Sequence, residues 1–197
     1  MTDRIKKQKS ELTVTMWMTL DGFIAGPNGE LDWILGDEQM SDYEIGVISD
    51  ADTILFGRKT YQEFYAYWSE KGPPKKGWEK IFAAKMNALN KVVASKTIEK
   101  AEWNDSKIIS GISAARIETL KSESKNGIVI YGSASIVQQL TNEGLIDEFQ
   151  LLIHPTLLGD GKKLFEDVGK TGLELVKSEA FKSGVMVLTY RPAYKSV

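Results

Sequence analysis

The sequence TILFGRKT, residues 53–60, passes from an apolar strand through a glycine directly into a predicted helix. The sequence IVIYGSAS, residues 128–135, repeats this order further along the chain. A glycine at the carboxyl end of a strand lets the backbone approach a ligand closely, and the helix that follows directs unpaired N–H groups and its positive dipole end at the same place. Such a junction can bind phosphate, although many α/β proteins use it only as a tight connection. Two such junctions in one chain could hold the two ends of a dinucleotide.

The side chains at the two junctions favour a binding role. The first junction adds Arg58 and Thr60, a cation and a hydroxyl that a simple turn does not need, although Arg58 could also form a surface salt bridge. The second has four small residues in a row, Gly132, Ser133, Ala134 and Ser135. Neither junction matches G-x-G-x-x-G, so the usual Rossmann motif is absent. We interpret the pair as the site of a nucleotide cofactor.

Composition limits the remaining possibilities. The chain has 197 residues and a net charge of −2, which suits one domain with a full core and gives no electrostatic footprint for nucleic acid. Residues 1–11 are basic and nearly free of apolar side chains, so we expect a flexible terminus before a single domain at 12–197. No run has the length of a membrane span or the character of a secretory signal. We expect a cytoplasmic protein that does not bind membranes.

The cysteine and histidine content excludes several kinds of catalytic and metal site. The chain has no cysteine, which excludes disulfides, thiolate metal sites and cysteine nucleophiles and permits a reducing cytoplasm. The one histidine, His154, cannot build a multi-histidine metal site, and no G-x-S-x-G elbow accompanies it. Zinc-dependent deamination lacks its ligands. We therefore predict that the protein has no metal site and that His154 has a structural role. The groups that remain available for catalysis are carboxylates, hydroxyls, lysines and a bound organic cofactor.

The order of elements predicts a three-layer α/β fold. Its central mixed, mostly parallel sheet has about eight strands flanked by helices and ends in an antiparallel C-terminal hairpin. The last two strands follow one another without a helix, with a turn at 182–184. The expected strands are residues 12–18, 53–56, 91–94, 107–109, 128–131, 148–154, 173–180 and 185–190.

Local sequence patterns predict the positions or buried faces of three helices. Ser41 and Glu44 form a capping box, which predicts a helix over 42–49. Helical spacing then predicts two buried faces. They consist of Tyr61, Phe64, Tyr65 and Trp68 in one helix and Trp78, Ile81, Phe82 and Leu89 in the next. For the aromatic face, core packing is favoured over a stacking platform.

Several loop residues are candidates for chemistry because they follow strands, where open α/β sheets bind ligands. Asp21 could transfer a proton or grip a substrate amine or hydroxyl, or it could only form a turn before the next glycine. Ala25 offers backbone groups for a planar amide such as nicotinamide. Trp33 could flank a flat substrate or pin its loop to the core. Ser95 and Lys96 could meet an adenosine or its phosphate.

Four motifs in this order resemble one family. They are TLDGFIAG at 19–26, FGRKTY at 56–61, YGSAS at 131–135 and PTLLGDGKKLF at 155–165. Together they resemble the dihydrofolate-reductase-like fold and, more narrowly, the reductase domain of bacterial riboflavin biosynthesis and its stand-alone relatives. The resemblance covers roughly residues 12–191.

The resemblance implies NADPH as cofactor and a role for each matching residue. Arg58 would meet the adenosine 2′-phosphate, and Ser95 would lie beside the adenosine. Ala25 would hold the nicotinamide carboxamide. Asp21 matches an aspartate that handles a proton or binds ribose, and it is the catalytic candidate; Asp21 and Trp33 are the expected substrate contacts. Thr60 would meet the pyrophosphate, and Gly132, Ser133, Ala134 and Ser135 would cradle it from the other side. Gly57 is a further expected cofactor contact.

The implied activity is an NADPH-dependent reductase resembling 5-amino-6-(5-phosphoribosylamino)uracil reductase. Two alternatives stay open: a dihydrofolate-reductase-like enzyme acting on another pterin or carbonyl substrate, and a nucleotide-binding protein without turnover. The resemblance is also consistent with a homodimer. This chain departs from dihydrofolate reductase on its first helix, where Asp37, Glu38 and Asp42 are near the expected carboxylate but out of register. It also lacks the deaminase half of the riboflavin enzyme.

Overall fold

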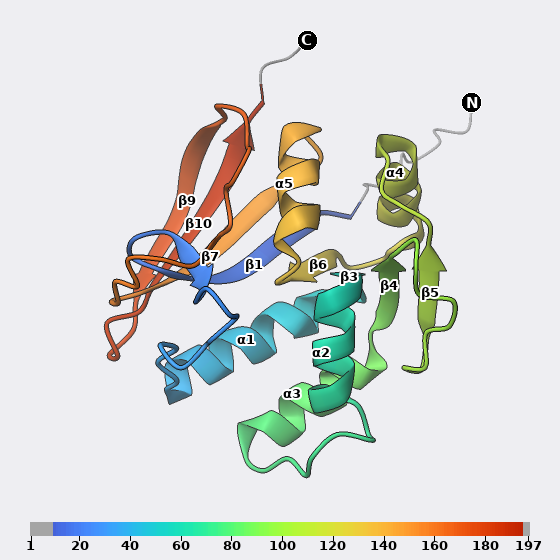
Figure 1. The fold of residues 1–197 in the computed structure, drawn as a ribbon, viewed down its shortest axis with the longest axis horizontal. Coiled ribbons are helices and arrows are strands. Elements are labelled where there is room, and N and C mark those ends of the chain that lie inside the picture. Colours follow the sequence, from blue (N-terminus) through green and yellow to red (C-terminus); the bar gives the residue numbers. More distant parts are fainter. Residues whose placement is uncertain (1–9, 195–197) are drawn as a thin grey trace, which may run out of the picture.

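The centre of the molecule is an eight-stranded sheet. The computed structural model describes residues 10–194. The sheet has the order β5-β4-β3-β6-β1-β7-β10-β9, in which β5 through β7 are parallel and the β10–β9 hairpin is antiparallel (Figure 1). Its strands are β1 (Leu12–Thr19), β3 (Thr53–Gly57), β4 (Asn90–Ala94), β5 (Ser106–Ile109), β6 (Ile128–Tyr131), β7 (Glu148–His154), β9 (Gly172–Ala180) and β10 (Met186–Ala193). The predicted fold class is confirmed.

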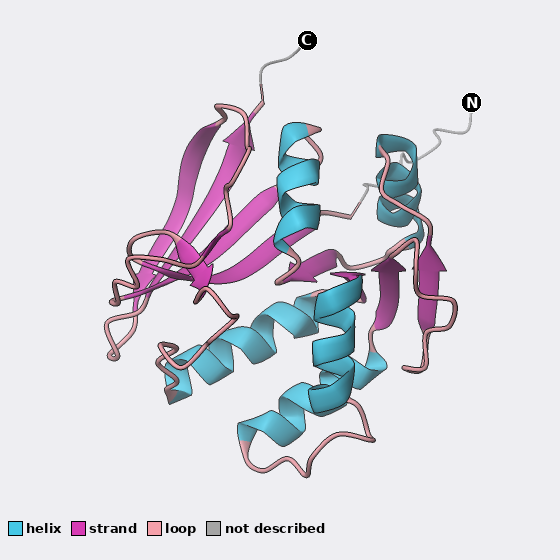
Figure 2. Ribbon diagram, in the orientation of Figure 1, coloured by secondary structure: helices cyan, strands magenta, loops and turns pink. Residues whose placement is uncertain are grey.

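Helices cover both faces of this sheet (Figure 2). They are α1 (Glu38–Asp50), α2 (Arg58–Trp68), α3 (Trp78–Ala88), α4 (Ala114–Glu123) and α5 (Ala134–Asn142). The first three share one buried cluster that includes Ile48, Tyr61 and Phe82, whereas α4 and α5 share another that includes Ile117 and Leu140. The two clusters lie on opposite faces, because successive strand residues alternate between them.

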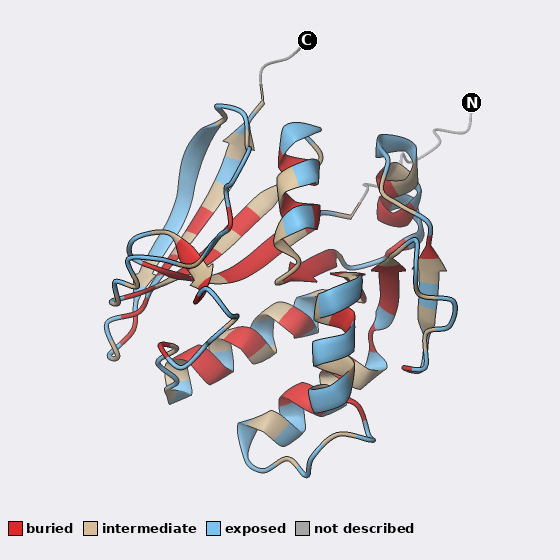
Figure 3. Ribbon diagram, viewed as in Figure 1, coloured by how far each residue is buried: buried red, intermediate tan, exposed pale blue. Residues whose placement is uncertain are grey.

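The central strands are apolar throughout because they are covered on both sides. All four residues of β6 are buried, and in β3 only the last residue is partly exposed (Figure 3). This is the pattern of parallel strands between two helical layers. Such a sheet is a rigid support for the loops at its carboxyl edge.

The start of α1 differs from the expected one. The helix begins at Glu38 and not at residue 42, because Asp37 is its N-cap and accepts a hydrogen bond from the Met40 amide at 2.7 Å. The predicted capping box was therefore wrong, and Glu44 is not a capping residue but is buried inside the molecule.

The predicted face of α3 was also wrong in part. Trp78 and Ile81 are 39% and 52% exposed, and the buried residues of this helix are Phe82, Ala83 and Met86. The indole of Trp78 packs instead beside Trp68 of α2, with 6.1 Å between ring centroids. The aromatic face of α2 packs against the core as expected.

A small second sheet joins two loops that were expected to be irregular. It pairs β2 (Phe23–Ala25) with β8 (Lys162–Lys163) in antiparallel orientation. Strands of two or three residues are too short to show a periodic pattern. This sheet fastens the loop after β1 to the loop after β7.

The first described residues, Ser10 and Glu11, make polar contacts with the rest of the protein. The expected flexible terminus, residues 1–11, lies outside the described residues except for Ser10 and Glu11. Ser10 bonds to the Lys121 carbonyl, and Glu11 pairs with Arg191 at 3.1 Å. Within residues 10–194, every helix is too short or too polar to cross a bilayer.

Candidate functional site

The two strand–glycine–helix junctions lie side by side. Strands β3 and β6 are parallel neighbours, with Thr53 opposite Ile128, so that α2 and α5 begin at the same edge of the sheet. The Gly57 amide donates to Ser133 Oγ at 2.9 Å. The Ser133 amide donates to Thr60 Oγ1 at 3.1 Å. These two reciprocal bonds join the junctions into one structure.

Both helices begin without a side-chain cap. Gly57 and Ser133 are the N-cap residues of α2 and α5, and neither makes a side-chain capping bond. Ser133 adopts the left-handed conformation, with φ +56° and ψ +48°, which costs about 1–2 kcal/mol for a residue with a side chain. The first amides of each helix have no intrahelical partner, and their dipoles add positive charge at this point. Two such termini side by side are suited to bind an anionic group.

Gly132 allows this close approach. Its φ is +61°, and a Cβ at this position would lie 3.0 Å from Thr60 Cγ2. A side chain would therefore separate the two junctions. Gly57 has a φ of −79°, which any residue can adopt, so the glycine at the first junction is not required by conformation.

A cavity of about 650 Å³ opens at this edge of the sheet. It extends from the loop after β1 to the end of β4, a size that suits an extended organic ligand. All nine residues predicted to bind the cofactor line it: Ala25, Gly57, Arg58, Thr60, Ser95, Gly132, Ser133, Ala134 and Ser135.

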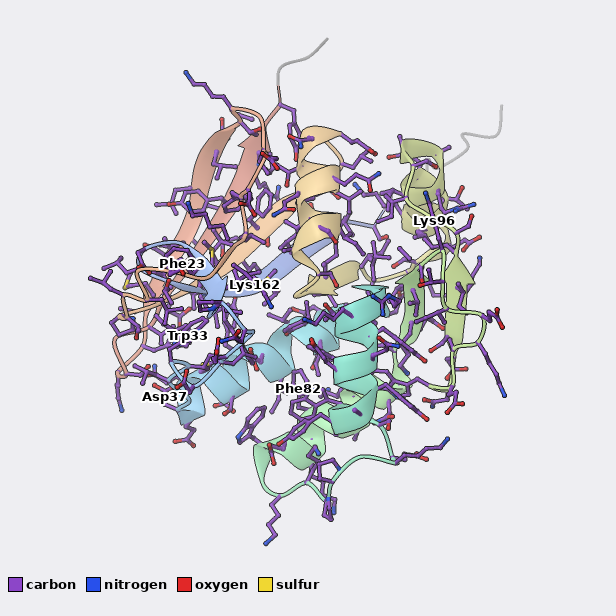
Figure 4. All side chains as sticks on the ribbon, viewed as in Figure 1. Phe23, Trp33, Asp37, Phe82, Lys96 and Lys162 are labelled. Atoms are coloured by element: carbon purple, nitrogen blue, oxygen red, sulfur yellow. The ribbon has the colours of Figure 1, made fainter. Side chains whose placement is uncertain are left out.

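The charge of this cavity is positive. Arg58, Lys59, Lys96 and Lys162 line it, and the one lining carboxylate, Glu63, pairs with Lys59 at 3.9 Å. Lys162 and Lys96 lie on opposite sides of the α2 and α5 N-termini (Figure 4). The Arg58 guanidinium donates to Gln62 Oε1 at 3.2 Å and has no carboxylate partner within residues 10–194. The salt-bridge alternative for Arg58 is therefore not observed, and its charge is available to an anionic ligand.

Asp21 is held by the neighbouring loop. Its carboxylate accepts hydrogen bonds from Thr19 Oγ1 at 2.5 Å and from the amides of Gly159 and Leu158 at 2.8 and 3.0 Å. The Thr19 hydroxyl and these amides lower the pKa of Asp21, so it stays ionised. Asp21 does not line the cavity. These contacts differ from both predicted roles, proton transfer and a local turn before Gly22: the Asp21 side chain fastens the loop after β7.

Trp33 and His154 pack against each other away from the cavity. The Trp33 indole donates to the Glu30 carbonyl at 3.2 Å, and its ring meets the His154 ring edge-on at 5.2 Å. His154 Nδ1 accepts from the Leu35 amide at 3.2 Å. Burial lowers the pKa of His154 to about 4, so the imidazole is neutral. Neither residue lines the cavity, which favours the loop-pinning alternative for Trp33.

The floor of the cavity consists of residues that the sequence patterns did not identify. Thr15 and Trp17 of β1 and Tyr131 of β6 line it, and Glu44 of α1 lies behind it, bonded to the Trp17 indole. Glu44 falls between Met40 and Ile48 at helical spacing, and all three are buried. One acidic residue among apolar residues at helical spacing is the sequence pattern that could have identified Glu44. Within residues 10–194, no group of three or more histidine and carboxylate side chains could hold a metal ion.

Comparison with known proteins relates this arrangement to a family. The model of the family described as RibD C-terminal domain matches residues 10–187. The chain is 34% identical over 194 residues to the uncharacterized protein YyaP of Bacillus subtilis (strain 168), covering 96% of this chain and 98% of that protein.

Two solved structures show the same fold. One is a putative riboflavin biosynthesis protein from Shewanella sp. PV-4, with a TM-score of 0.75 and 20% identity over 93% of this chain and 99% of the other. The second is dihydrofolate reductase from Enterococcus faecalis complexed with NADP(H), with a TM-score of 0.61 and 16% identity over 93% of this chain and 97% of the other.

Proposed function

Because the chain belongs to the RibD C-terminal domain family, we propose that it is an NADPH-dependent reductase of the riboflavin-biosynthesis type. The observation that carries this proposal is the meeting of two uncapped helix N-termini in one cationic cavity. Such a centre suits the diphosphate of a dinucleotide, and membership in this family supports a nicotinamide dinucleotide as the ligand.

The residues of the cavity fit this cofactor. The free amides of Ala134 and Ser135, with the Thr60 hydroxyl, would hold the pyrophosphate. Arg58 would hold the 2′-phosphate, because its planar fork matches phosphate oxygens and no carboxylate among residues 10–194 pairs with it. Ser95 would lie beside the adenosine, and the Ala25 backbone would bind the carboxamide. When bound, NADPH supplies a hydride.

The remaining surface of the cavity suits a planar substrate that accepts the hydride. Trp17, Tyr131 and Phe64 line it with aromatic side chains, and the loop after β1 covers it through the β2–β8 sheet. The protein would align the two reactants and exclude water, which are the main contributions that a cofactor enzyme makes. A planar pyrimidine or pterin ring bearing a C=N or C=O carbon is the proposed substrate. We further propose that the reaction takes place in the cytoplasm.

The test is an assay of NADPH oxidation with each of two substrates and without substrate. We expect absorbance loss with 5-amino-6-(5-phosphoribosylamino)uracil, little with dihydrofolate, and none without substrate. A preference for dihydrofolate or another pterin would favour the dihydrofolate-reductase-like alternative. Tight NADPH binding without turnover of any substrate would contradict the enzyme assignment and favour a nucleotide-binding protein.

A further inference from the structure

A carboxyl group lies buried behind the aromatic floor of the cavity. Glu44, near the middle of α1, is only 2% exposed. The Trp17 indole nitrogen donates to Glu44 Oε1 at 2.5 Å. Within residues 10–194 this indole is the only hydrogen-bond partner of the Glu44 carboxyl, so its second oxygen has none.

The groups around Glu44 supply no cation. Tyr131 of β6 is buried, its hydroxyl has no partner within residues 10–194, and its ring lines the cavity. Tyr43, the neighbour of Glu44 on α1, donates its hydroxyl to Gln150 Oε1 at 3.0 Å. The face that α3 buries consists of Phe82, Ala83 and Met86 and carries no titratable group. Within residues 10–194, therefore, no cation pairs with the Glu44 carboxyl, and its one hydrogen-bond partner is the neutral Trp17 indole.

An ionised carboxylate is unfavourable in such a place. Burying a charge without a partner costs several kcal/mol, and the group takes up a proton instead. Burial raises the pKa of Glu44 to about 8, although the Trp17 N–H offsets part of this effect. At neutral pH the carboxyl is protonated, and it loses its proton as the pH rises through 8.

We propose that Glu44 is a positioning residue for the reduction: its protonated carboxyl fixes the Trp17 indole at the floor of the cavity and keeps that floor free of charge. This inference rests on the proposed function. A ring that accepts a hydride gains negative charge, and a carboxylate behind the floor would oppose that gain. A neutral carboxyl does not.

The substrate class follows from the distribution of charge. The cations Arg58, Lys59, Lys96 and Lys162 line the cavity, whereas its floor, which includes Trp17 and Tyr131, carries no charge. The floor accordingly suits an uncharged planar ring, and any phosphate on the substrate has to lie toward the lysines.

The decisive variant is Glu44→Gln. Its amide oxygen can still accept the Trp17 N–H, but the side chain cannot ionise. The readout is the Trp17 indole N–H resonance of the free protein, identified by its loss in Trp17→Phe. We expect this resonance to titrate with a midpoint about pH 8 in the wild type and to stay constant in Glu44→Gln. Glu38→Gln, at an exposed acid of the same helix, is the control and should titrate like the wild type.

The rate profile provides the second readout. Wild-type kcat should fall about tenfold between pH 7 and pH 9, as expected for one group with this pKa, whereas Glu44→Gln should keep its rate. A constant Trp17 resonance in the wild type, or identical profiles for both proteins, would overturn the proposal. If the Trp17 resonance titrates but no substrate is turned over, the proposed function and the positioning role are both contradicted. The conclusion that the Glu44 carboxyl is protonated at neutral pH would still hold.

Discussion

At the scale of single residues, Arg58 shows how a side chain is kept available for a ligand. It begins α2 at the edge of the cavity, where its one observed contact is the neutral amide of Gln62. Its neighbour Lys59 instead pairs with Glu63. A cation that has no carboxylate partner in the described part of the chain, next to two helix N-termini, is expected to contribute to anion binding.

Substituting Arg58→Ala should therefore weaken NADPH far more than NADH, because only NADPH carries the 2′-phosphate. Loss of one charge-assisted contact corresponds to about 10- to 100-fold in affinity. Fluorescence titration with both cofactors measures this, with Arg191→Ala on β10 as the control that leaves both affinities unchanged. Equal losses for NADPH and NADH would refute the role of Arg58.

Asp21→Asn tests a different assignment. Its carboxylate accepts three hydrogen bonds from the loops it joins, and an amide cannot accept all three equally. We expect a lower Tm and faster proteolysis of the loop at 155–161, with NADPH affinity retained. A large loss of kcat with unchanged stability would restore the catalytic role predicted from the sequence.

The residues that the sequence could identify follow from topology. Arg58, Thr60 and Ser133 come directly after parallel strands, and such positions must meet at one edge of the sheet. Glu44 could not be identified in this way, because the same letters fit a capping box. The structure shows that Asp37 caps the helix and that Glu44 lies inside the molecule, bonded to Trp17 of β1.

At the scale of elements, the two junctions form one unit. Gly57 donates to the Ser133 hydroxyl, and the Ser133 amide donates to Thr60, so that each helix start fixes the other. The strands and most helices were predictable because β3 and β6 are continuously apolar and the helices have regular spacing. The β2–β8 pair was not, since its strands are too short for any pattern.

Replacement of Gly132 tests this unit. In Gly132→Ala the new methyl would meet Thr60 and force a left-handed conformation on alanine, so we expect a loss of about 1–2 kcal/mol of stability and weaker NADPH binding. The matched control is Gly46→Ala in α1, where a Cβ has open space and helix propensity predicts a gain of about 0.5–1 kcal/mol. Urea unfolding measures both. An equal effect of the two substitutions would show that the close approach is unimportant.

At the scale of the whole molecule, the sheet ends in an exposed edge. Nearly all of β9 is exposed, including Leu173, Leu175 and Val176, and its outer side has no neighbouring strand in the described sheet (Figure 3). Long, exposed edge strands tend to pair with another chain.

We therefore expect a homodimer formed through β9. Sedimentation equilibrium should give the mass of two chains, and Leu175→Glu should shift it to that of one. Leu157→Glu, at an exposed leucine in the loop after β7, is the control and should remain dimeric. A monomeric wild type, or a dimer that survives Leu175→Glu, would contradict this interface.

The central claim is that the two junctions form one nucleotide site, and hydrogen exchange upon NADPH addition tests it most directly. The amides of residues 58–60 and 134–135 have no helical partner, so they should exchange quickly in the free protein. We predict that NADPH slows exchange in both segments together and at the same cofactor concentration. Protection of only one segment, or of neither while NADPH binds elsewhere, would contradict the account.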